Sequence, residues 1–330
     1  MPANLTPNYL AAEERFRAAV TTEEKLAALD EMYATIPKHK GTEKLRADIK
    51  RRVSKLREKD KQSGKKGKHF DAFQIDKQGA GQIILLGPSN SGRSMLLSRL
   101  TSAEPEIADY PYTTRAPMPG MMEFEDVTIQ LVDTPPMFGE HTEGGVISLV
   151  RNADSVALVL DSSENALLDQ IEEIRAEMAK SRTVLAGARS GEHDLAAGAV
   201  LKPAFIVANK IDLLGAEENL AVLEEFYSGE FDIYQISARS GDGLEDLRRG
   251  IFDSLGIIRV YTKIPSKPSD LAKPFTLKKG STLMDFAATV HKDFVQHLRF
   301  ARVWGKHHLD GAQIGRDHVL EDGDVVELHE

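Results

Sequence analysis

The sequence of 330 residues predicts an α/β protein whose central part holds a mostly parallel β-sheet covered by helices on both faces. Between residues 70 and 256, short apolar runs alternate with stretches of helical spacing. A Gly-rich turn at 87–94 joins one apolar run directly to a helix. A region of helical patterns, 1–69, precedes this part, and a strand-rich region, 257–330, follows it. We therefore expect three domains with these boundaries.

The N-terminal region is expected to be helical and basic. Helical patterns cover 9–19 and 22–36, a third helix is expected from 41 or 42 to about 61, and 62–68 has the composition of a flexible linker. Residues 1–70 contain 17 Lys and Arg against 10 Asp and Glu, a net charge of +7, whereas the whole chain carries −9. The basic side of the third helix is either a solvated face or a surface that contacts RNA.

The central region alternates strands and helices. Strands are expected at 82–87, 127–133, 155–161, 204–209 and 232–237, and helices at 95–100, 166–181, 216–227 and 244–255. In such sheets, ligands bind at the carboxyl ends of the strands. The motifs that carry chemistry follow these strands.

The first motif is the Gly-rich turn, which matches G-x-x-x-x-G-K-[ST] at every fixed position except the lysine, where Arg93 stands. Its residues are Gly87, Pro88, Ser89, Asn90, Ser91, Gly92, Arg93 and Ser94. Backbone N–H groups of such a turn, next to a helix N-terminus, form a phosphate-binding cradle, and Ser94 would offer its hydroxyl to Mg²⁺. The alternative is a strand-to-helix turn that binds no ligand.

Three shorter motifs follow the next strands: Asp133-Thr134-Pro135-Pro136, Asn209-Lys210-Ile211-Asp212 and Ser237-Ala238-Arg239. Asp133 is either a carboxylate that holds Mg²⁺ through water or a residue that caps a buried turn. The Asp212 carboxylate is suited to accept both N1–H and N2–H₂ of guanine, with Asn209 and Lys210 supporting the pocket. A backbone N–H near Ala238 would meet guanine O6. Each motif is weak alone, but their order and position together are specific.

The C-terminal region predicts a β-grasp domain. A strand is expected at 275–279 and a helix at 282–294, which begins with a capping-box-like pair, Thr282 and Asp285. Alternating residues at 301–304 and 325–328 predict two further strands. The six histidines between His291 and His329 lack regular ligand spacing, which favours surface and turn positions over a metal site.

Together these motifs resemble the first, third, fourth and fifth motifs of a small GTPase. The segment Asp109–Thr114, followed by Pro117 and Gly120, resembles the switch segment of Obg-like GTPases, particularly the developmentally regulated GTP-binding proteins. The sequence RFARVWGKHH…GRDHVLEDGDVVELH is similar to a TGS domain, the ubiquitin-like module of that family. The helical region 36–57 also resembles the family, so the resemblance covers about 36–330.

The resemblance implies a P-loop GTPase that binds GTP or GDP with Mg²⁺, the metal being held by Ser94, Thr114 and Asp133. Arg93 and Thr114 are then the catalytic residues, with Thr113 as the alternative switch threonine. Asn90 matches the P-loop asparagine of potassium-stimulated relatives, which adds K⁺ as a cofactor; its alternative role is to adopt a turn conformation. The implied partner is the ribosome or RNA, reached through the basic helices and the TGS domain, with no sequence-specific recognition of DNA.

Two residues depart from the family motifs and predict slow GTP hydrolysis. Arg93 replaces a compact ammonium by a planar fork, and Pro136 replaces a glycine whose N–H contacts the γ-phosphate. Met137 stands where Ras-like proteins place a glutamine, which is normal for Obg-like proteins. The alternative is a guanine-nucleotide-binding adapter on ribosome or RNA that does not hydrolyse GTP. Asp212 and the TGS-like tail disfavour an ATP-dependent kinase.

Composition sets the expected compartment. The chain contains no cysteine, which excludes disulfides and thiol chemistry. Its N-terminus lacks a signal-peptide pattern, and no apolar run approaches the roughly 20 residues of a membrane span. We therefore expect a cytoplasmic protein that makes no membrane contact.

Overall fold

The computed structural model describes residues 7–18, 22–36, 42, 49–53, 73–101, 116–136, 144–191, 195, 197–264, 270–306 and 310–329. The chain divides into two compact units, Met1–Asp71 and Ala72–Glu330.

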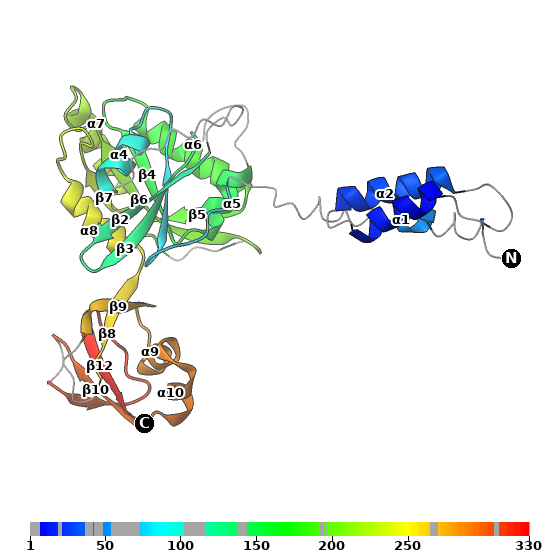
Figure 1. Ribbon diagram of the computed structural model, residues 1–330. Coiled ribbons are helices and arrows are strands. Elements are labelled where there is room, and N and C mark those ends of the chain that lie inside the picture. The colour runs from blue at the N-terminus through cyan, green and yellow to red at the C-terminus, as the bar shows by residue number, and fades with distance from the viewer. Residues whose placement is uncertain are drawn as a thin grey trace. The chain divides into compact units, whose positions relative to one another are not determined.

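The first unit contains a pair of helices, α1 (Pro7–Ala18) and α2 (Thr22–Thr35), which pack side by side (Figure 1). Tyr9 and Leu29 are among the apolar residues of their shared core. Of the predicted third helix, residues 49–53 are helical. The remainder of that helix and the predicted basic linker lie outside the described residues.

The second unit begins with a seven-stranded sheet in the order β2-β3-β1-β4-β6-β5, with β7 also paired to β6. Its strands are β1 (Gln82–Leu86), β2 (Met118–Phe124), β3 (Val127–Asp133), β4 (Ser155–Asp161), β5 (Thr183–Ala186), β6 (Val200–Asn209) and β7 (Ile233–Gln235). All pairs are parallel except β2 with β3, which form an antiparallel hairpin. The predicted mostly parallel sheet is therefore confirmed.

Helices cover both faces of this sheet (Figure 1). They are α4 (Arg93–Leu100), α5 (Gly144–Asn152), α6 (Leu167–Lys180), α7 (Ala216–Tyr227) and α8 (Leu244–Ser254). One apolar core contains side chains of α5, α6 and α7, and the other contains side chains of α4 and α8. Because both faces are covered, β1 and β4 are buried at every residue, which explains their continuous apolar sequences.

Three elements of this part lack a clear sequence signal. The edge strand β2 contains Pro119 and Gly120, which normally indicate a turn, and it forms because β3 supplies its partner. The strand β5 has only four residues, which is too short for a clear strand pattern. The helix α5 begins at Gly144, directly after residues 137–143, which lie outside the described residues. Tertiary pairing and packing decide these elements.

The second sheet has the order β11-β10-β12-β8-β9. Its elements are β8 (Ile257–Thr262), β9 (Asp270–Lys278), β10 (Phe300–Trp304), β11 (Ala312–Ile314) and β12 (Asp324–His329), with α9 (Leu283–Val290) and α10 (Lys292–His297). The pair β12 and β8 is parallel and the other pairs are antiparallel. The helix α9 packs on one face through Leu283 and Phe286. This mixed sheet with one packed helix agrees with the predicted β-grasp fold.

The helix expected at 282–294 is divided in the structure. It begins with the predicted capping box, in which the Thr282 N–H donates to Asp285 Oδ2 over 2.7 Å and Asp285 N donates back to Thr282 Oγ1 over 3.4 Å. It is interrupted at His291, whose backbone is extended and whose Nδ1 accepts from Asp293 N over 3.3 Å. A histidine that caps the following helix thus produces two short helices in place of one.

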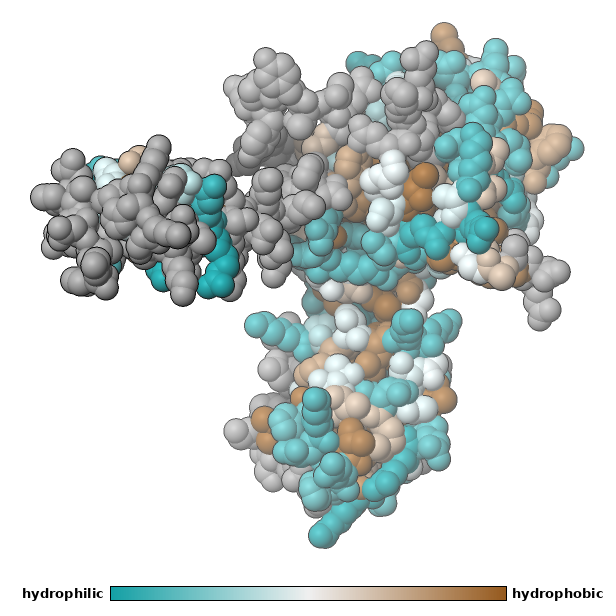
Figure 2. Space-filling model, turned by 90° about the vertical axis from the view of Figure 1, so that its right-hand side faces the viewer, coloured by the Kyte–Doolittle hydropathy of each residue, from teal (hydrophilic) through white to brown (hydrophobic). Residues whose placement is uncertain are grey.

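On the face drawn in Figure 2, the described residues mix hydrophilic side chains with scattered hydrophobic ones. Among the described residues, no helix has the length and apolar character needed to cross a membrane.

Candidate functional site

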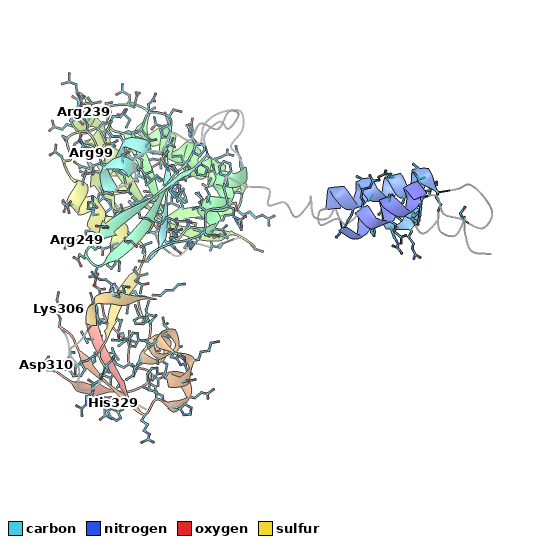
Figure 3. All side chains as sticks on the ribbon, viewed as in Figure 1. Arg99, Arg239, Arg249, Lys306, Asp310 and His329 are labelled. Atoms are coloured by element: carbon cyan, nitrogen blue, oxygen red, sulfur yellow. The ribbon has the colours of Figure 1, made fainter. Side chains whose placement is uncertain are left out.

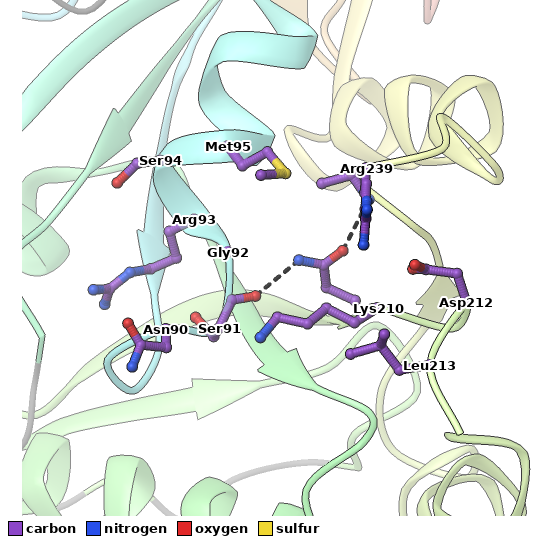
Figure 4. A pocket seen from close by; sticks show the side chains of 12 residues that line it. Asn90, Ser91, Gly92, Arg93, Ser94, Met95, Lys210, Asp212, Leu213 and Arg239 are labelled. Carbon is purple, nitrogen blue, oxygen red and sulfur yellow. Dashed lines mark hydrogen bonds between the residues drawn. The ribbon is translucent and has the colours of Figure 1, made fainter. Parts of the chain in front are cut away.

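Three of the four predicted motifs meet at one pocket of about 460 Å³ at the carboxyl ends of β1, β6 and β7. The pocket is lined by Asn90, Ser91, Gly92, Arg93, Ser94, Met95, Asn209, Lys210, Asp212, Leu213, Ala238 and Arg239. Asp212 and Arg239 lie at one end and Arg93 and Ser94 at the other, with Lys210 between them (Figure 4). Its volume is in the range of small-molecule sites.

The Gly-rich loop requires glycine at both of its fixed glycine positions. A Cβ on Gly87 would lie 2.1 Å from the Val159 carbonyl oxygen, on the neighbouring strand β4. Gly92 has φ +94°, and a Cβ there would lie 2.3 Å from Asn209 Nδ2. Both positions therefore reject any larger residue, and Gly92 also adopts the left-handed conformation before α4 begins at Arg93. The first N–H groups of α4 have no acceptor within the helix, as at the start of any α-helix.

Asn209 joins the Gly-rich loop to the Ser237–Arg239 loop. Its Nδ2 donates to the Ser91 carbonyl oxygen over 2.8 Å, and its Oδ1 accepts from the Ala238 N–H over 2.9 Å. The side chain is 1% exposed. One buried amide thus fixes the distance between the two ends of the pocket, a role more specific than the pocket support predicted from the sequence.

Lys210 forms a second link across the sheet, because its Nζ pairs with the Asp161 carboxylate at the end of β4. The backbone of Lys210 has φ +67°, which is uncommon for a residue other than glycine. Burial opposes ionisation of Asp161, but hydrogen bonds from Lys210 and Ser163 outweigh it and lower the pKa of the carboxyl group. No sequence motif includes Asp161, so its place beside Lys210 is visible only in the structure.

The end of the pocket with Asp212 contains apolar and basic groups. Met95 and Leu213 belong to none of the predicted motifs, but they line the pocket and are 51% and 39% exposed. Each directly follows a predicted motif residue, which is the signal that could have identified it. Arg99, on α4, donates to the carbonyl oxygens of Ala238 and Arg239 over 3.1 and 2.6 Å. The loop therefore keeps a fixed conformation beside Asp212.

Ser237 does not line the pocket. It is fully buried, its N–H donates to the Asp242 carbonyl oxygen over 3.0 Å, and its Oγ accepts from Ser240 N over 3.1 Å. These bonds shape the turn that presents Ala238 and Arg239. Gly87, Pro88 and Ser89 likewise form the loop without lining the pocket.

Asp133, at the end of β3, does not line the pocket but contacts Ser94 and Arg93, which line its opposite end. Ser94 Oγ donates to Asp133 Oδ2 over 2.5 Å, and Arg93 Nε lies 3.4 Å from Asp133 Oδ1. The Arg93 guanidinium also donates through Nη1 to the Gly87 carbonyl oxygen. Burial raises the pKa of Asp133, against the opposing effects of the Ser94 hydrogen bond and the Arg93 charge.

The oxygen atoms of Ser94 and Asp133 are suitable ligands for a magnesium ion. Mg²⁺ prefers hard oxygen ligands, and the Ser94 hydroxyl and the Asp133 carboxylate are adjacent donors of that kind. Asp133 Oδ1 is buried and receives no hydrogen bond from the described residues. Elsewhere, no group of three or more His, Asp or Glu side chains among the described residues is arranged to hold a metal.

Some of the remaining predicted residues lie in the described part of the chain and others do not. Asn90 has φ +63°, so its role in adopting a turn conformation is observed. Thr134, before the two prolines, is buried and donates to the Leu85 carbonyl oxygen over 2.9 Å. Pro136 is half-buried after this turn. Thr113, Thr114, the rest of the predicted switch segment 109–114 and Met137 lie outside the described residues.

Comparisons with known proteins agree with this arrangement. Residues 82–188 match the model of the family described as 50S ribosome-binding GTPase, and residues 258–330 match that of the TGS domain. A GTP-binding protein of Methanocaldococcus jannaschii is 29% identical, over 93% of this chain and 92% of that protein. Developmentally-regulated G-protein 2 of Arabidopsis thaliana is 27% identical, over 92% of this chain and 90% of that protein. Ribosome-interacting GTPase 1 of Saccharomyces cerevisiae is 27% identical, over 93% of this chain and 99% of that protein.

The two family models match the two sheets of the second unit. The sheet with the Gly-rich loop corresponds to the GTPase model, and the β-grasp sheet corresponds to the TGS model. The similarity to these three relatives spans nearly the full length of this chain and of each relative. The chain therefore combines a part that matches the 50S ribosome-binding GTPase family with a C-terminal part that matches the TGS domain, and it is similar over nearly its whole length to developmentally regulated GTP-binding proteins.

Proposed function

We propose that this chain binds GTP and GDP in the pocket between the Gly-rich loop and Asp212, hydrolyses GTP slowly, and acts on the ribosome or its RNA. The proposal assigns the nucleotide to the 70–256 domain, between the helical region 1–69 and the TGS domain 257–330. We expect this action in the cytoplasm.

The single observation that carries the proposal is the link made by Asn209. Its two hydrogen bonds hold the Gly-rich loop and the Ala238 loop at a fixed separation, with Asp212 at one end of the pocket they enclose. A purine nucleotide bound in this pocket would place its phosphates at the Gly-rich loop and its base beside Asp212. The Asp212 carboxylate would accept both guanine N1–H and N2–H₂, a pair of donors that adenine lacks. This chemistry favours guanine nucleotides over ATP.

The other end of the pocket would hold the phosphates. The loop amides and the N-terminus of α4 offer N–H groups to phosphate oxygens, and Arg93 adds a positive charge. Ser94 and Asp133, together with Thr114, would hold Mg²⁺, which neutralises charge that develops on the transferring phosphoryl group. Asn90 leaves K⁺ as a further proposed cofactor.

Slow turnover is expected from the contacts of Arg93 and from the missing N–H of Pro136. The Arg93 guanidinium interacts with Gly87 and Asp133, so it is less available to interact with a phosphate. Pro136 has no N–H to donate to a γ-phosphate. Both effects weaken contacts with the γ-phosphoryl group, and such contacts accelerate hydrolysis to the extent that they strengthen in the transition state.

The same two residues favour a second candidate function, a guanine-nucleotide-binding adapter that does not hydrolyse GTP. In that case GDP and GTP would bind with similar affinity, and the chain would serve as a scaffold on the ribosome. Binding of nucleotide is common to both candidates, and turnover distinguishes them.

The experiment uses the purified full chain. Binding of a fluorescent GDP analogue is competed with GTP, GDP and ATP, and phosphate release is then followed with and without ribosomes, in K⁺ and in Na⁺. We expect competition by guanine nucleotides alone and measurable phosphate release. Equal competition by ATP would contradict the base assignment. Guanine binding with no phosphate release under any condition would favour the adapter.

A further inference from the structure

A second hollow lies beside the C-terminal end of α8, on the face of the parallel sheet that α8 covers. Its volume is about 350 Å³, within the range of small-molecule sites. Small residues form much of its lining, and its larger side chains are those of Leu201, Pro203, Phe205, Tyr234, Asp232 and Asp253. Among the described residues, none lines both this hollow and the pocket at the Gly-rich loop.

The hollow and the nucleotide pocket lie at different ends of the domain. In Figure 3, Arg249, near the C-terminal end of α8, is well separated from Arg99 and Arg239, which lie beside the nucleotide pocket. A ligand in the hollow is therefore independent of the nucleotide.

Alternate residues of β6 form one apolar wall of the hollow. Leu201, Pro203 and Phe205 are two residues apart in this strand, so their side chains point to the same face of the sheet. Phe205 is buried in the core that contains α8, whereas Leu201 is 41% exposed and Pro203 is also exposed. The wall thus continues from the core to the surface, where an apolar ligand could cover it.

Tyr234 has a fixed position and a free hydroxyl group. Its ring lies edge-on to Phe205, with ring centroids 5.6 Å apart and ring planes at 90°. A Cβ on Gly250 would lie 2.1 Å from the Tyr234 ring, so this interior position of α8 requires glycine although glycine weakens a helix. Among the described residues, none forms a hydrogen bond with the Tyr234 hydroxyl.

The charged side chains that line the hollow are both acidic. Asp232 is paired with Arg189 over 2.7 Å. Asp253 forms neither an ion pair nor a side-chain hydrogen bond with any residue in the described part of the chain. No described lysine or arginine lines the hollow. One carboxylate there has no direct partner.

The position of Asp253 in α8 adds to this negative charge. Asp253 is the penultimate residue of the helix, whose last turn contains no basic residue. The C-terminal end of a helix carries a partial negative charge, which favours cations and disfavours carboxylates. Without a bound cation, Asp253 is therefore in an unfavourable place, and a cation would remove that cost.

The pKa values of two groups report the same negative potential. Partial burial raises the pKa of Asp253, and nearby carboxylates add to the increase against the opposing charges of Arg249 and Lys279. Burial also raises the pKa of Tyr234, and the charges of Asp232 and Asp253 contribute. A positive charge in the hollow would act in the opposite direction on both groups.

We propose that this hollow binds a small organic cation, an ammonium group carried on an apolar body. The ammonium group donates to the Asp253 carboxylate and the Tyr234 hydroxyl at the C-terminal end of α8, and the apolar body packs on Leu201 and Pro203. An anion is repelled by Asp253, and an inorganic cation gains nothing from the apolar wall. The proposal does not depend on the proposed function, because the two sites are separate.

The test measures binding of phenethylamine to the purified full chain by saturation-transfer NMR. Phenethyl alcohol and phenylacetate are the matched neutral and anionic probes. We expect a Kd of about 1 mM for phenethylamine, which has about nine non-hydrogen atoms, and binding at least about fivefold weaker for the other two. Addition of GDP and Mg²⁺ should leave the affinity unchanged.

Asp253→Asn should weaken phenethylamine binding at least about fivefold. The same variant should raise the Tm by about 1–3 °C, because it removes a carboxylate from the negative end of α8. The matched control is Asp246→Asn in the first turn of α8, outside the lining of the hollow. It should leave binding unchanged and lower the Tm, because a carboxylate at the N-terminal end of a helix is favourable.

Two further variants test the shape of the hollow and its hydroxyl group. Ala188→Leu places a larger apolar side chain in the exposed part of the lining and should weaken binding about fivefold without a change in charge. Tyr234→Phe removes the hydroxyl and should weaken binding about threefold. Circular dichroism of each variant reports whether the chain is folded.

Phenethylamine binding that Asp253→Asn and Ala188→Leu leave unchanged would overturn this site, as would a wild-type chain that does not bind phenethylamine. Equal binding of phenethyl alcohol would overturn the role of the charge. Equally effective competition by tetralysine would overturn the choice of a small apolar cation in favour of a basic peptide. Failure of the chain to bind GDP would contradict the proposed function and leave this result unaffected.

Discussion

Arg93 and Asp133 form an ion pair beneath the Gly-rich loop, with Arg93 Nε 3.4 Å from Asp133 Oδ1 and the two side chains only 8% and 11% exposed. The same guanidinium donates to the Gly87 carbonyl oxygen. A lysine at this position has one compact ammonium and cannot make both contacts with the geometry of a guanidinium. Arg93 thus stabilises the loop in a way that a lysine at this position would not.

We predict that Arg93→Lys combined with Pro136→Gly increases the preference for triphosphate over diphosphate by about tenfold and raises turnover. The lysine would be free to lie between phosphate oxygens, and the glycine would restore an N–H donor. The measurement is competition of GDP against a non-hydrolysable GTP analogue. Arg93→Met, which removes the charge, should weaken both nucleotides. A wild-type protein that already favours the triphosphate strongly would contradict the prediction.

Base specificity should depend on Asp212. Asp212→Asn replaces one acceptor oxygen by a donor and should weaken GDP binding by about 2–4 kcal/mol, while xanthine nucleotides regain affinity. Titration of the variant with GDP and XDP measures both effects. Glu217→Gln, on the first turn of α7 and away from the pocket lining, is the matched control. Unchanged GDP affinity in Asp212→Asn would assign base recognition to another residue.

Asn209→Ala should separate the two loops that form the pocket. The substitution removes hydrogen bonds to Ser91 and Ala238, which should lower the free energy of unfolding by about 2 kcal/mol and weaken GDP binding. Asn219→Ala is the control, because Asn219 donates to the Ser162 carbonyl oxygen over 2.9 Å outside the pocket. Urea unfolding and GDP titration are measured on both. If GDP binding falls equally in both variants, Asn209 has no special role.

The Lys210–Asp161 pair should make the free energy of unfolding depend on pH in the acidic range. Since the folded-state pKa of Asp161 is lowered, the pair stabilises the native state above the unfolded carboxyl pKa of about 3.9. That contribution is lost as the pH falls through the lower, folded-state value. Asp161→Asn should therefore be less stable than wild type at pH 7, and the difference should shrink below about pH 4. Urea unfolding between these pH values measures it; a constant difference would contradict the assignment.

Arg259, on β8, should be essential to the stability of the C-terminal sheet. Its guanidinium pairs with Glu125, with Asp126 over 2.9 Å and with Asp322 over 2.8 Å, and it lies over the Phe252 ring. The side chain is 12% exposed, so Arg259→Ala leaves three carboxylates without their shared cation. We expect a loss of about 3 kcal/mol in the free energy of unfolding. Arg249→Ala is the exposed control, and a loss below about 1 kcal/mol for Arg259→Ala would contradict the prediction.

Features that depend on residues close together in the chain could be predicted before the structure was known. The buried strands β1, β3, β4 and β6 follow from their apolar runs, and the start of α9 follows from the Thr282 capping box. Helix α7 begins and ends at the predicted residues. The Gly-rich loop and the order of its companion motifs at strand ends were also readable, because parallel topology brings the carboxyl ends of strands together.

Tertiary structure alone decided which side chains meet across the sheet. Asn209 bonds to Ser91, 118 residues away, and Arg259 bonds to the β2–β3 turn, and neither pairing leaves a local pattern in the sequence. The same holds for Lys210 with Asp161 and for Arg93 with Asp133. Residue type and spacing specify backbone conformation over a few residues. The partner of a long side chain depends on which groups the packed tertiary structure brings within hydrogen-bonding distance of it.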